Sequence, residues 1–397
     1  MDRVILHCDC NSFYASVETV LDPRLKNVPM AVCGDPQSRH GIILAKNEHA
    51  KRFGVQTAET IYAAKKKCPA LVLVAPHREL YSEFSKKAND IYKEYTDLVE
   101  PFGLDESWLD VTNSRLLFGS GKQIADELRQ RFKTELGISC SVGVAFNKSM
   151  AKLASDYQKP DATTVITREN FKRLVYPLPI SALLYAGRHT TEALKKLYIS
   201  TIGDLAAANR GTIVKHLGKT GGLLFDYACG IDEEPVESIY KEYAQKSIGS
   251  SLTFKQDLRS EEDLKYGTMT VARELTLRMR RAHVKCTTLC AGIKYHDFTS
   301  ATKQMPLEFA TNLFSEITAT ALLLIHQLNK SRKPVRMLSI TGTHLIADTA
   351  DHIQLSFFET NESQHKKQQQ LEDAIEKIRN KYGVSSVELG SLLNKDM

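Results

Sequence analysis

Two adjacent acidic residues at the tip of an expected β-hairpin constrain this chain more than any other feature. Asp105 and Glu106 lie between the β-favouring runs 96–102 and 108–111, and Gly103 offers the turn that joins them. Paired carboxylates at a strand edge are costly to hold unless a cation neutralises them. A solvated turn is the ordinary place for such a pair, and the hairpin alone favours that interpretation.

A third acid far upstream shifts the balance towards a cation site. Asp9 ends the short apolar run 4–8, and the runs 98–111 and 139–145 have the pattern of neighbouring strands. These runs bring acids at positions 9, 105 and 106 close to strand ends. We therefore expect the three carboxylates to bind two divalent cations, which activate an attacking hydroxyl and stabilise phosphorus in an in-line displacement.

The residues around these acids suit a nucleoside triphosphate. Backbone amides at the turn before the helix-patterned run 13–18 can hold phosphate oxygens, as helix N-termini commonly do. Phe13 and Tyr14 are consecutive, so one can pack into the core while the other stands over the sugar, although both could be core residues. Lys159 can reach the triphosphate and offset the charge that develops on the leaving pyrophosphate.

Length, composition and charge exclude several classes of protein. The chain has 397 residues, of which 42% are apolar and 25% charged. It is too long to fold around a single hydrophobic core, so we expect several globular domains. No run is long enough to span a membrane, the N-terminus has no export signal, and the eight scattered cysteines lack zinc-site spacing. We expect a cytoplasmic protein with reduced thiols.

Changes in pattern and charge along the chain indicate separate domains. Residues 171–235 predict short helices with glycine-rich turns that suit contact with a DNA backbone. Residues 245–347 alternate as β-α-β-β-α-β, a sheet with helices on one face. The net charge of +6 resides within residues 241–350, which indicates a nucleic-acid-binding module or a merely basic surface. The candidate DNA contacts are Arg332, Lys333 and Arg336.

The tail contains one short motif and one amphipathic segment. The motif places a glutamine before spaced apolar anchors, a pattern that fits an apolar pocket on a partner; its residues are Gln354, Leu355, Phe357 and Phe358. The segment 366–381 predicts a helix with one apolar stripe. This helix either binds a partner or folds back on the body, and the sequence favours neither.

In combination, these segments resemble the Y-family (translesion) DNA polymerases, above all their bacterial members. The resemblance covers residues 4–358, most of the chain. It is carried by the segments 7–18 (HCDCNSFYASVE), 50–55 (AKRFGV), 104–107 (LDES), 141–145 (SVGVA), 159–160 (KP) and 246–254 (KSIGSSLTF).

The resemblance implies an α+β multidomain fold with the right-hand arrangement of these polymerases. A ferredoxin-like palm would comprise residues 1–10 and 75–166, and small fingers would comprise residues 11–74. A helical thumb with helix-hairpin-helix elements would follow at 167–232, then a linker at 233–244. The β-α-β-β-α-β little finger would comprise residues 245–347, and the tail residues 348–397.

The resemblance also assigns roles in the site. Two Mg²⁺ ions would be held by Asp9, Asp105 and Glu106, with the backbone carbonyl of Cys10 as a further ligand. Tyr14 would be the steric gate against ribonucleotides, with Phe13 beside it, and Lys159 would contact the triphosphate.

The fingers depart from the pattern of many relatives. Where those relatives carry a tyrosine and an arginine for the triphosphate, this chain has Glu48 and Lys51. Lys51 keeps the positive charge without the arginine fork, whereas Glu48 opposes a triphosphate. Lys46 is placed to compensate.

The activity implied is template-directed addition of deoxynucleotides to a primer 3′ end, at low fidelity and without proofreading. Its partners would be primer–template DNA, a deoxynucleoside triphosphate and a sliding clamp bound through residues 354–358, and we expect a monomer. Two alternatives stay open. One is a catalytically silent DNA- and clamp-binding accessory protein on the same fold; the other is a palm-type nucleotidyl cyclase, which would not need the basic C-terminal module.

Overall fold

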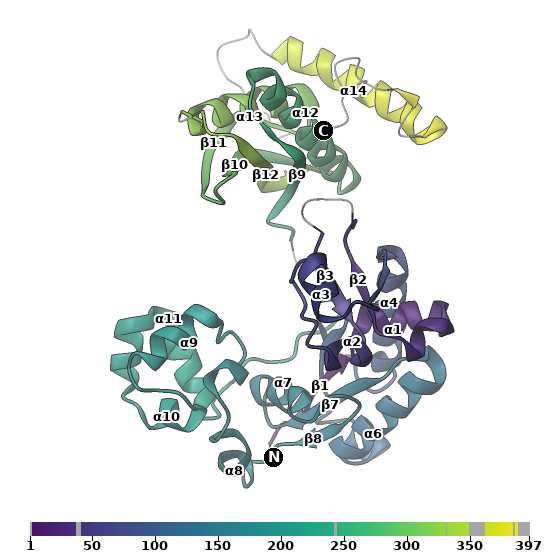
Figure 1. Cartoon of the computed structure of the whole chain (residues 1–397), viewed down its shortest axis with the longest axis vertical. Helices are drawn as coiled ribbons and strands as arrows, with labels where there is room; N and C mark the ends of the chain where they lie inside the picture. The colour runs from purple at the N-terminus through teal and green to yellow at the C-terminus, as the bar shows by residue number, and fades with distance from the viewer. Residues whose placement is uncertain are drawn as a thin grey trace. The chain divides into compact units, whose positions relative to one another are not determined.

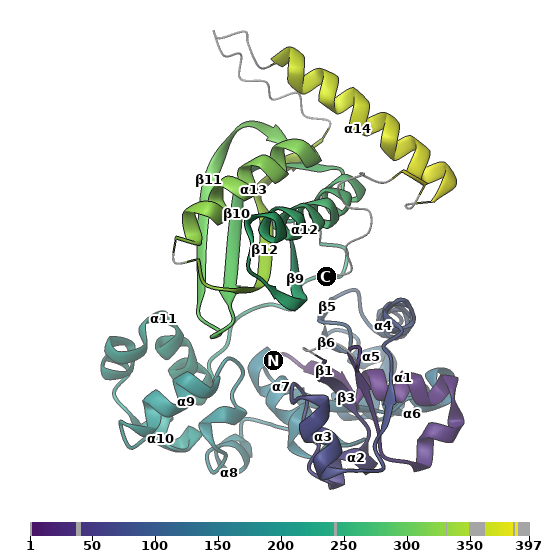
Figure 2. The same cartoon turned by 45° about the horizontal axis from the view of Figure 1, so that its top comes forward.

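The computed structural model describes residues 2–36, 41–241, 244–330, 332–348, 362–383 and 386–387. The chain divides into two compact units, Met1–Glu242 and Tyr243–Met397, coloured from purple to teal and from green to yellow in Figures 1 and 2. Among the helices described, none is both long and apolar enough to cross a bilayer.

The first unit is built around a five-stranded sheet. Its strands, in spatial order, are β5 (Val99–Phe102), β6 (Glu106–Asp110), β1 (Ile5–Cys10), β7 (Cys140–Ala145) and β8 (Thr163–Val165). β1 pairs antiparallel with both β6 and β7, β5 forms the antiparallel hairpin with β6, and β8 runs parallel to β7. The three runs that the sequence pattern predicted as neighbours therefore lie side by side, with the fully buried β1 at the centre.

Successive residues of β1 face two different layers, as the alternation of a strand requires. Cys8 and Cys10 join the apolar core formed with helices α4 (Arg78–Lys93) and α6 (Gly121–Arg131). His7 and Asp9 instead contact residues of helix α7 (Lys148–Tyr157). The polar side chains of the central strand and helix α7 thus share one face of the sheet.

Helix α7 lies close against β7 because Gly143 has no side chain. A Cβ atom at this position would overlap the carbonyl oxygen of Ala151 and the amide nitrogen of Ser155. The helix begins where the Asn147 side chain accepts a hydrogen bond from the Met150 amide at 2.9 Å. This close approach sets how far residues of α7 reach towards the end of β1.

The segment predicted as fingers contains a smaller sheet of three strands. In spatial order these are β3 (Ile43–Lys46), β2 (Met30–Cys33) and β4 (Val72–Val74), with the helices α2 (Glu48–Arg52) and α3 (Ile61–Lys67) beside them. Helix α1 (Phe13–Leu21) contacts both sheets. Phe13 and Val17 belong to the core of the larger sheet, whereas Ala15 packs with Met30 and Val32 of the smaller one.

A helical region completes the first unit. It contains α8 (Phe171–Val175), α9 (Arg188–Lys195), α10 (Ile202–Ala207) and α11 (Arg210–Ala228). Buried residues of these helices, such as Leu205 and Leu224, share a core with Met150 of α7. The start of the predicted linker is tied to this unit as well, because Arg3 donates hydrogen bonds of 2.8 Å to the carbonyl oxygens of Asp232 and Glu234.

The second unit is a four-stranded antiparallel sheet with two helices on one face (Figure 2). Its elements are β9 (Ser247–Leu258), α12 (Glu261–Arg281), β10 (Val284–Tyr295), β11 (Ser300–Thr311), α13 (Phe314–Leu328) and β12 (Val335–Ala347), and the strands lie in the order β11-β10-β12-β9. The chain order is the predicted β-α-β-β-α-β pattern.

The last helix, α14 (Glu362–Tyr382), folds back on the second unit. Glu372 accepts hydrogen bonds from the backbone amides of Phe314 at 2.8 Å and Ser315 at 3.3 Å, so it caps the start of α13. Arg280 of α12 pairs with Glu372 at 3.4 Å and with Asp373 at 3.0 Å. The sequence left open whether this helix binds a partner or folds back on the body, and these contacts favour folding back. Residues 354–358, the predicted clamp motif, lie outside the described residues.

Candidate active site

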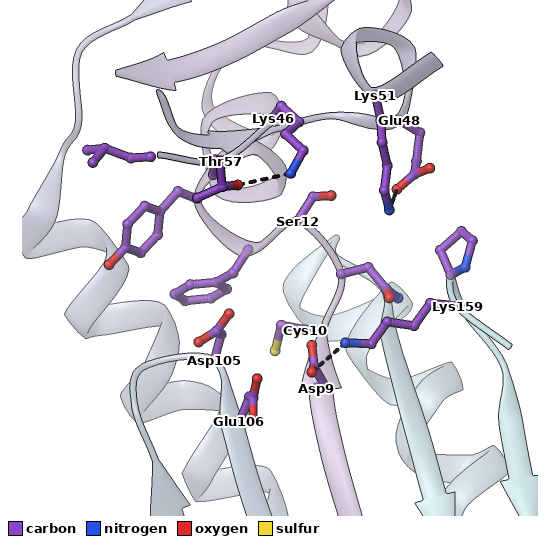
Figure 3. A pocket seen from close by; sticks show the side chains of 16 residues that line it. Asp9, Cys10, Ser12, Lys46, Glu48, Lys51, Thr57, Asp105, Glu106 and Lys159 are labelled. Carbon is purple, nitrogen blue, oxygen red and sulfur yellow. Dashed lines mark hydrogen bonds and ion pairs between the residues drawn. The ribbon is translucent and has the colours of Figure 1, made fainter. Parts of the chain in front are cut away.

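The three predicted cation ligands lie at one end of the larger sheet (Figure 3). The β1–β6 register places Asp9 directly opposite Glu106, and Asp105 precedes β6 in the hairpin turn. Gly103 takes φ +84°, which the turn requires, and the Cys10 amide donates a 2.9 Å hydrogen bond to the Asp105 carbonyl. Like charges directly opposite each other across a ladder repel, so this arrangement needs a neutralising partner.

Two lysines supply that partner. Lys152 Nζ lies 3.2 Å from Asp9 Oδ2, 3.1 Å from Glu106 Oε2 and 3.2 Å from Asp156 Oδ2. Lys159 pairs with Asp9 and, at 2.6 Å, with Asp156. Only Lys159 was predicted from the sequence. For Lys152, its spacing of four residues from Asp156 was a usable signal, since such residues share one helical face.

His7 is a second residue that the sequence analysis missed. It is fully buried, with Nδ1 2.9 Å from Ser155 Oγ and Nε2 3.3 Å from Glu106 Oε2. Burial lowers its pKa to about 4, so the ring is neutral at physiological pH. His7, Asp9 and Glu106 form one group whose possible ligand atoms lie within 4.8 Å of one another. The signal was its position two residues before Asp9, on the same face of a strand.

The three acids differ in how readily they ionise. Burial raises the pKa of Asp9 to about 6, against the opposing charges of Lys159 and Lys152. Burial and the neighbouring Glu106 raise the pKa of Asp105 as well. Burial also acts to raise the pKa of Glu106, but the contacts with His7 and Lys152 outweigh it and lower that pKa to about 2. A bound cation would therefore favour ionisation most at Asp9 and Asp105.

A cavity of about 450 Å³ opens beside the acids, between the end of β1 and the segment predicted as fingers. Lys46 and Thr57 line it and are joined by a 2.9 Å hydrogen bond, and Lys51 and Glu48 line it as an ion pair of 3.2 Å. The charge of the predicted Lys51 is thus offset by Glu48. The other lining residues are Asp9, Cys10, Asn11, Ser12, Phe13, Tyr14, Leu44, Ala45, Asp105, Glu106, Lys159 and Pro160.

The two consecutive aromatic residues are not equivalent. Phe13 is 3% exposed and belongs to the core of the larger sheet. Tyr14 is half-buried, lines the cavity and stacks on Tyr81, with ring centroids 4.1 Å apart and planes at 10°. This is the arrangement in which one aromatic packs inside and the other stands over the cavity.

The predicted DNA-contacting residues gather at the start of β12 in the second unit. Lys333 pairs with Asp297 at 2.9 Å, and the guanidinium of Arg336 lies over the Phe298 ring at 5.0 Å. Arg332, in the turn before them, takes φ +48°. Contact of these residues with DNA stays a prediction.

Comparison with known proteins identifies the family. A model of the impB/mucB/samB family matches residues 8–156, and a model of that family's C-terminal domain matches residues 245–357. The DNA polymerase IV of Acetivibrio thermocellus is 44% identical over 99% of this chain and 98% of its own length. The chain belongs to the DNA polymerase IV family. The polymerases IV of Clostridium kluyveri (34% identity) and Bacillus subtilis (polymerase IV 1, 35%) match 100% and 99% of this chain and 99% and 94% of their own length.

A solved structure supports the same fold. A Y-family DNA polymerase chimera of Dbh and Dpo4 superimposes with a TM-score of 0.78 over 87% of this chain and 99% of its own, at 24% identity. The α+β fold, the family and the enzyme class predicted from the sequence are confirmed. As a member of this family, the protein is a DNA-directed DNA polymerase of the translesion class, and the alternatives of a silent accessory protein and a cyclase are dropped.

The donor set of the site fits divalent cations. Asp9, Asp105 and Glu106 offer carboxylate oxygens, the ligands that Mg²⁺ prefers, around a cavity large enough for a nucleotide. The opposed carboxylates of Asp9 and Glu106 gain from any added positive charge. A metal-dependent polymerase with an acidic metal site at this end of the sheet is therefore consistent with the described residues.

Magnesium should raise the thermal unfolding midpoint, and by more near pH 8 than near pH 5. Without metal, the raised pKa of Asp9 means that its ionised form costs stability, a cost that grows as the pH rises from about 4 through about 6. A carboxyl group must lose its proton to bind the cation, so binding strengthens over the same range. Saturation with magnesium should raise the unfolding midpoint by about 5 °C near pH 8, and circular dichroism measures this midpoint.

Sodium chloride at equal ionic strength provides the control for this measurement. Sodium should leave the midpoint unchanged, because screening alone acts weakly on buried pairs. An equal rise at both pH values would mean that Asp9 does not take part in binding the cation.

Proposed function

We propose that the protein adds deoxynucleotides to a primer 3′ end with two Mg²⁺ ions, at low fidelity and without proofreading. Asp9, Asp105 and Glu106 hold the ions, and the backbone carbonyl of Cys10 is a further ligand. When bound, such a pair of ions lowers the pKa of the attacking hydroxyl and stabilises charge on the transferred phosphate. The supporting observation is the register that sets Asp9 opposite Glu106 beside the cavity.

The remaining residues of the cavity bind and orient the nucleotide. Lys159 exchanges its pair with Asp9 for the triphosphate, where its ammonium group offsets the charge that the leaving pyrophosphate gains. Lys46 and Lys51 bind further phosphate oxygens, and Glu48 weakens that binding because it already pairs with Lys51. Tyr14 stands against the sugar and excludes a 2′-hydroxyl.

Primer extension tests this proposal directly. Purified protein, a primed template and the four deoxynucleotides should give Mg²⁺-dependent extension, abolished by chelation and restored by added metal. A panel of damaged templates tests lesion bypass in the same assay. Extension at full rate in excess chelator, or removal of the primer 3′ end by a proofreading activity, would contradict the proposal.

Tyr14→Ala should relax discrimination against ribonucleotides by about 10- to 100-fold. The estimate follows because forcing an extra group into a well-packed site costs about 1–3 kcal/mol, and about 1.4 kcal/mol corresponds to tenfold in rate. The ratio of kcat/KM for matched deoxynucleotides and ribonucleotides measures the effect. Tyr62→Ala is the control, because Tyr62 is 80% exposed on α3 and does not line the cavity. Unchanged discrimination in Tyr14→Ala would remove the gate assignment.

The partners and domains follow from the same proposal. Primer–template DNA lies along the basic module, with Arg332, Lys333 and Arg336 as phosphate contacts, and the affinity of the protein for DNA should fall steeply as the salt concentration rises.

A sliding clamp binds residues 354–358, and the protein works in the cytoplasm with the DNA it copies. Deleting 354–358 should weaken clamp binding and spare distributive synthesis. We keep the domain boundaries given above: palm, fingers, thumb, linker, little finger and tail.

A further inference from the structure

The gate residue rests on a second ring that takes no part in lining the cavity. Tyr14 of α1 stacks almost parallel on Tyr81 of α4, at 4.1 Å between ring centroids. Tyr81 is completely buried, and Phe13 packs at a tilt against both rings. Because the near-parallel contact covers one face of the Tyr14 ring, the position of Tyr81 fixes how far Tyr14 can retreat from the cavity.

A buried carboxylate holds Tyr81 in place. The Tyr81 hydroxyl donates a hydrogen bond to Glu18 Oε1, and the Glu18 side chain is only 3% exposed. His77 Nδ1 lies 3.0 Å from both carboxylate oxygens. A hydrogen bond to a carboxylate is about twice as strong as one between neutral groups, so this contact fixes the ring firmly.

The order of these residues along the two helices links the carboxylate to the gate. Glu18 follows Tyr14 by four residues, so both point from the same face of α1 towards α4. His77 immediately precedes α4 and Tyr81 lies in its first turn, where the Tyr81 amide donates to the His77 carbonyl at 3.2 Å. Two helices from segments far apart in the sequence are thus joined by one polar cluster directly behind the gate.

The cluster has no role in the chemistry described above. Neither Glu18, His77 nor Tyr81 lines the cavity, and none contacts Asp9, Asp105 or Glu106 in the hydrogen bonds and ion pairs of the described residues. A buried carboxylate is costly unless it is fully paired, and an apolar residue would pack α1 against α4 without that cost. The contact that the cluster does make is with the ring behind Tyr14.

We propose that Glu18 is a positioning residue for sugar selection, which acts by holding the Tyr81 ring against the back of Tyr14. This inference rests on the proposed role of Tyr14 as the gate. Loss of the Glu18–Tyr81 contact lets the two rings shift away from the cavity, and a 2′-hydroxyl then fits where it was excluded. Deoxynucleotides, which do not press on the gate, are affected little.

The test compares single-nucleotide incorporation by wild type, Glu18→Gln and Tyr81→Phe with matched deoxynucleotides and ribonucleotides. Tyr81→Phe keeps the stacked ring and removes only the hydroxyl. Discrimination against ribonucleotides should fall by about 3- to 10-fold in Tyr81→Phe, which loses the hydrogen bond. It should fall by less in Glu18→Gln, because the amide oxygen still accepts from the Tyr81 hydroxyl but without the charge. The change should come from kcat/KM for the ribonucleotide, with the deoxynucleotide value within about twofold of wild type.

Two further variants separate positioning from stability. Glu18→Leu combined with Tyr81→Phe removes both partners, so no buried polar group is left unpaired, and it should fold while discriminating poorly. Tyr92→Phe is the matched control, because Tyr92 is another buried tyrosine of α4 that does not line the cavity. It should discriminate like wild type.

The Tyr14→Ala background decides between the possible outcomes. With the gate ring absent, Glu18→Gln should cause no further loss of discrimination, because the two residues act as one unit. If Tyr14→Ala relaxes discrimination but Glu18→Gln and Tyr81→Phe do not, the gate stands and our inference is overturned. Parallel losses with both sugars would also overturn it, since they indicate a merely structural role. If Tyr14→Ala discriminates normally, the gate assignment itself fails, and the inference fails with it.

Discussion

Asp105→Asn should lower the rate of nucleotide addition by about 1,000-fold or more, the largest effect we expect from a change of so few atoms. The amide preserves the shape of the side chain but removes the charge that holds a divalent cation. Single-turnover primer extension measures the rate of the chemical step without interference from DNA release. The requirement for Mg²⁺ should rise in parallel, because the remaining acids bind the ions less tightly.

Stability distinguishes this loss from misfolding. The raised pKa of Asp105 means that its ionised form costs folding free energy at neutral pH, so Asp105→Asn should unfold at the same temperature as wild type or higher. Asp22→Asn is the control, because Asp22 pairs with Arg24 at the surface, away from the cavity. A variant that keeps more than about a tenth of the wild-type rate would show that Asp105 is not a metal ligand.

Gly143→Ala should destabilise the first unit by about 4 kcal/mol or more, which corresponds to a fall of about 10 °C in the unfolding midpoint. The new methyl group would overlap backbone atoms of Ala151 and Ser155, which cannot rotate away as a flexible side chain could. Helix α7 must then move off the sheet and carry Lys152 with it. Activity should fall together with stability, because Lys152 neutralises Asp9 and Glu106.

Gly187→Ala is the matched substitution for this measurement. A Cβ atom at Gly187 meets nothing within 4 Å, and φ of −67° is open to any residue. Its midpoint should stay within about 3 °C of wild type. Equal stability of the two variants would mean that α7 can yield at little cost, and the argument for its close approach would fail.

The local part of the site was predictable from the sequence. Asp105 and Glu106 stand in a hairpin marked by Gly103, and Asp9 ends an apolar run, so short-range pattern was enough to predict one cluster. The family resemblance supplied the roles of Tyr14 and Cys10, which spacing alone left open. The register that sets Asp9 opposite Glu106 is a pairing between distant segments, and it became visible only in the structure.

The contacts that hold the site in place were not predictable in the same way. From the sequence, Lys152 is predicted only as a polar residue on an amphipathic helix. Its contact with two acids depends on the close approach of α7 to β7 that Gly143 allows. From the sequence, Glu18 is predicted to face solvent on α1, but in the structure the packing of α4 against α1 buries it. The polar composition of residues 233–244 predicted a linker, although the Arg3 side chain donates a hydrogen bond to the Glu234 carbonyl and so attaches the start of this segment to the first unit.

The lysine that bridges Asp9 and Glu106 has a consequence for how folding depends on metal. Small metal-dependent domains whose ligands repel one another stay unfolded until the metal arrives. Here Lys152 already pairs with both carboxylates from within the chain, so their mutual repulsion is offset before any cation binds. A cation that bound Asp9 and Glu106 would have to compete with this ammonium group for the two carboxylates.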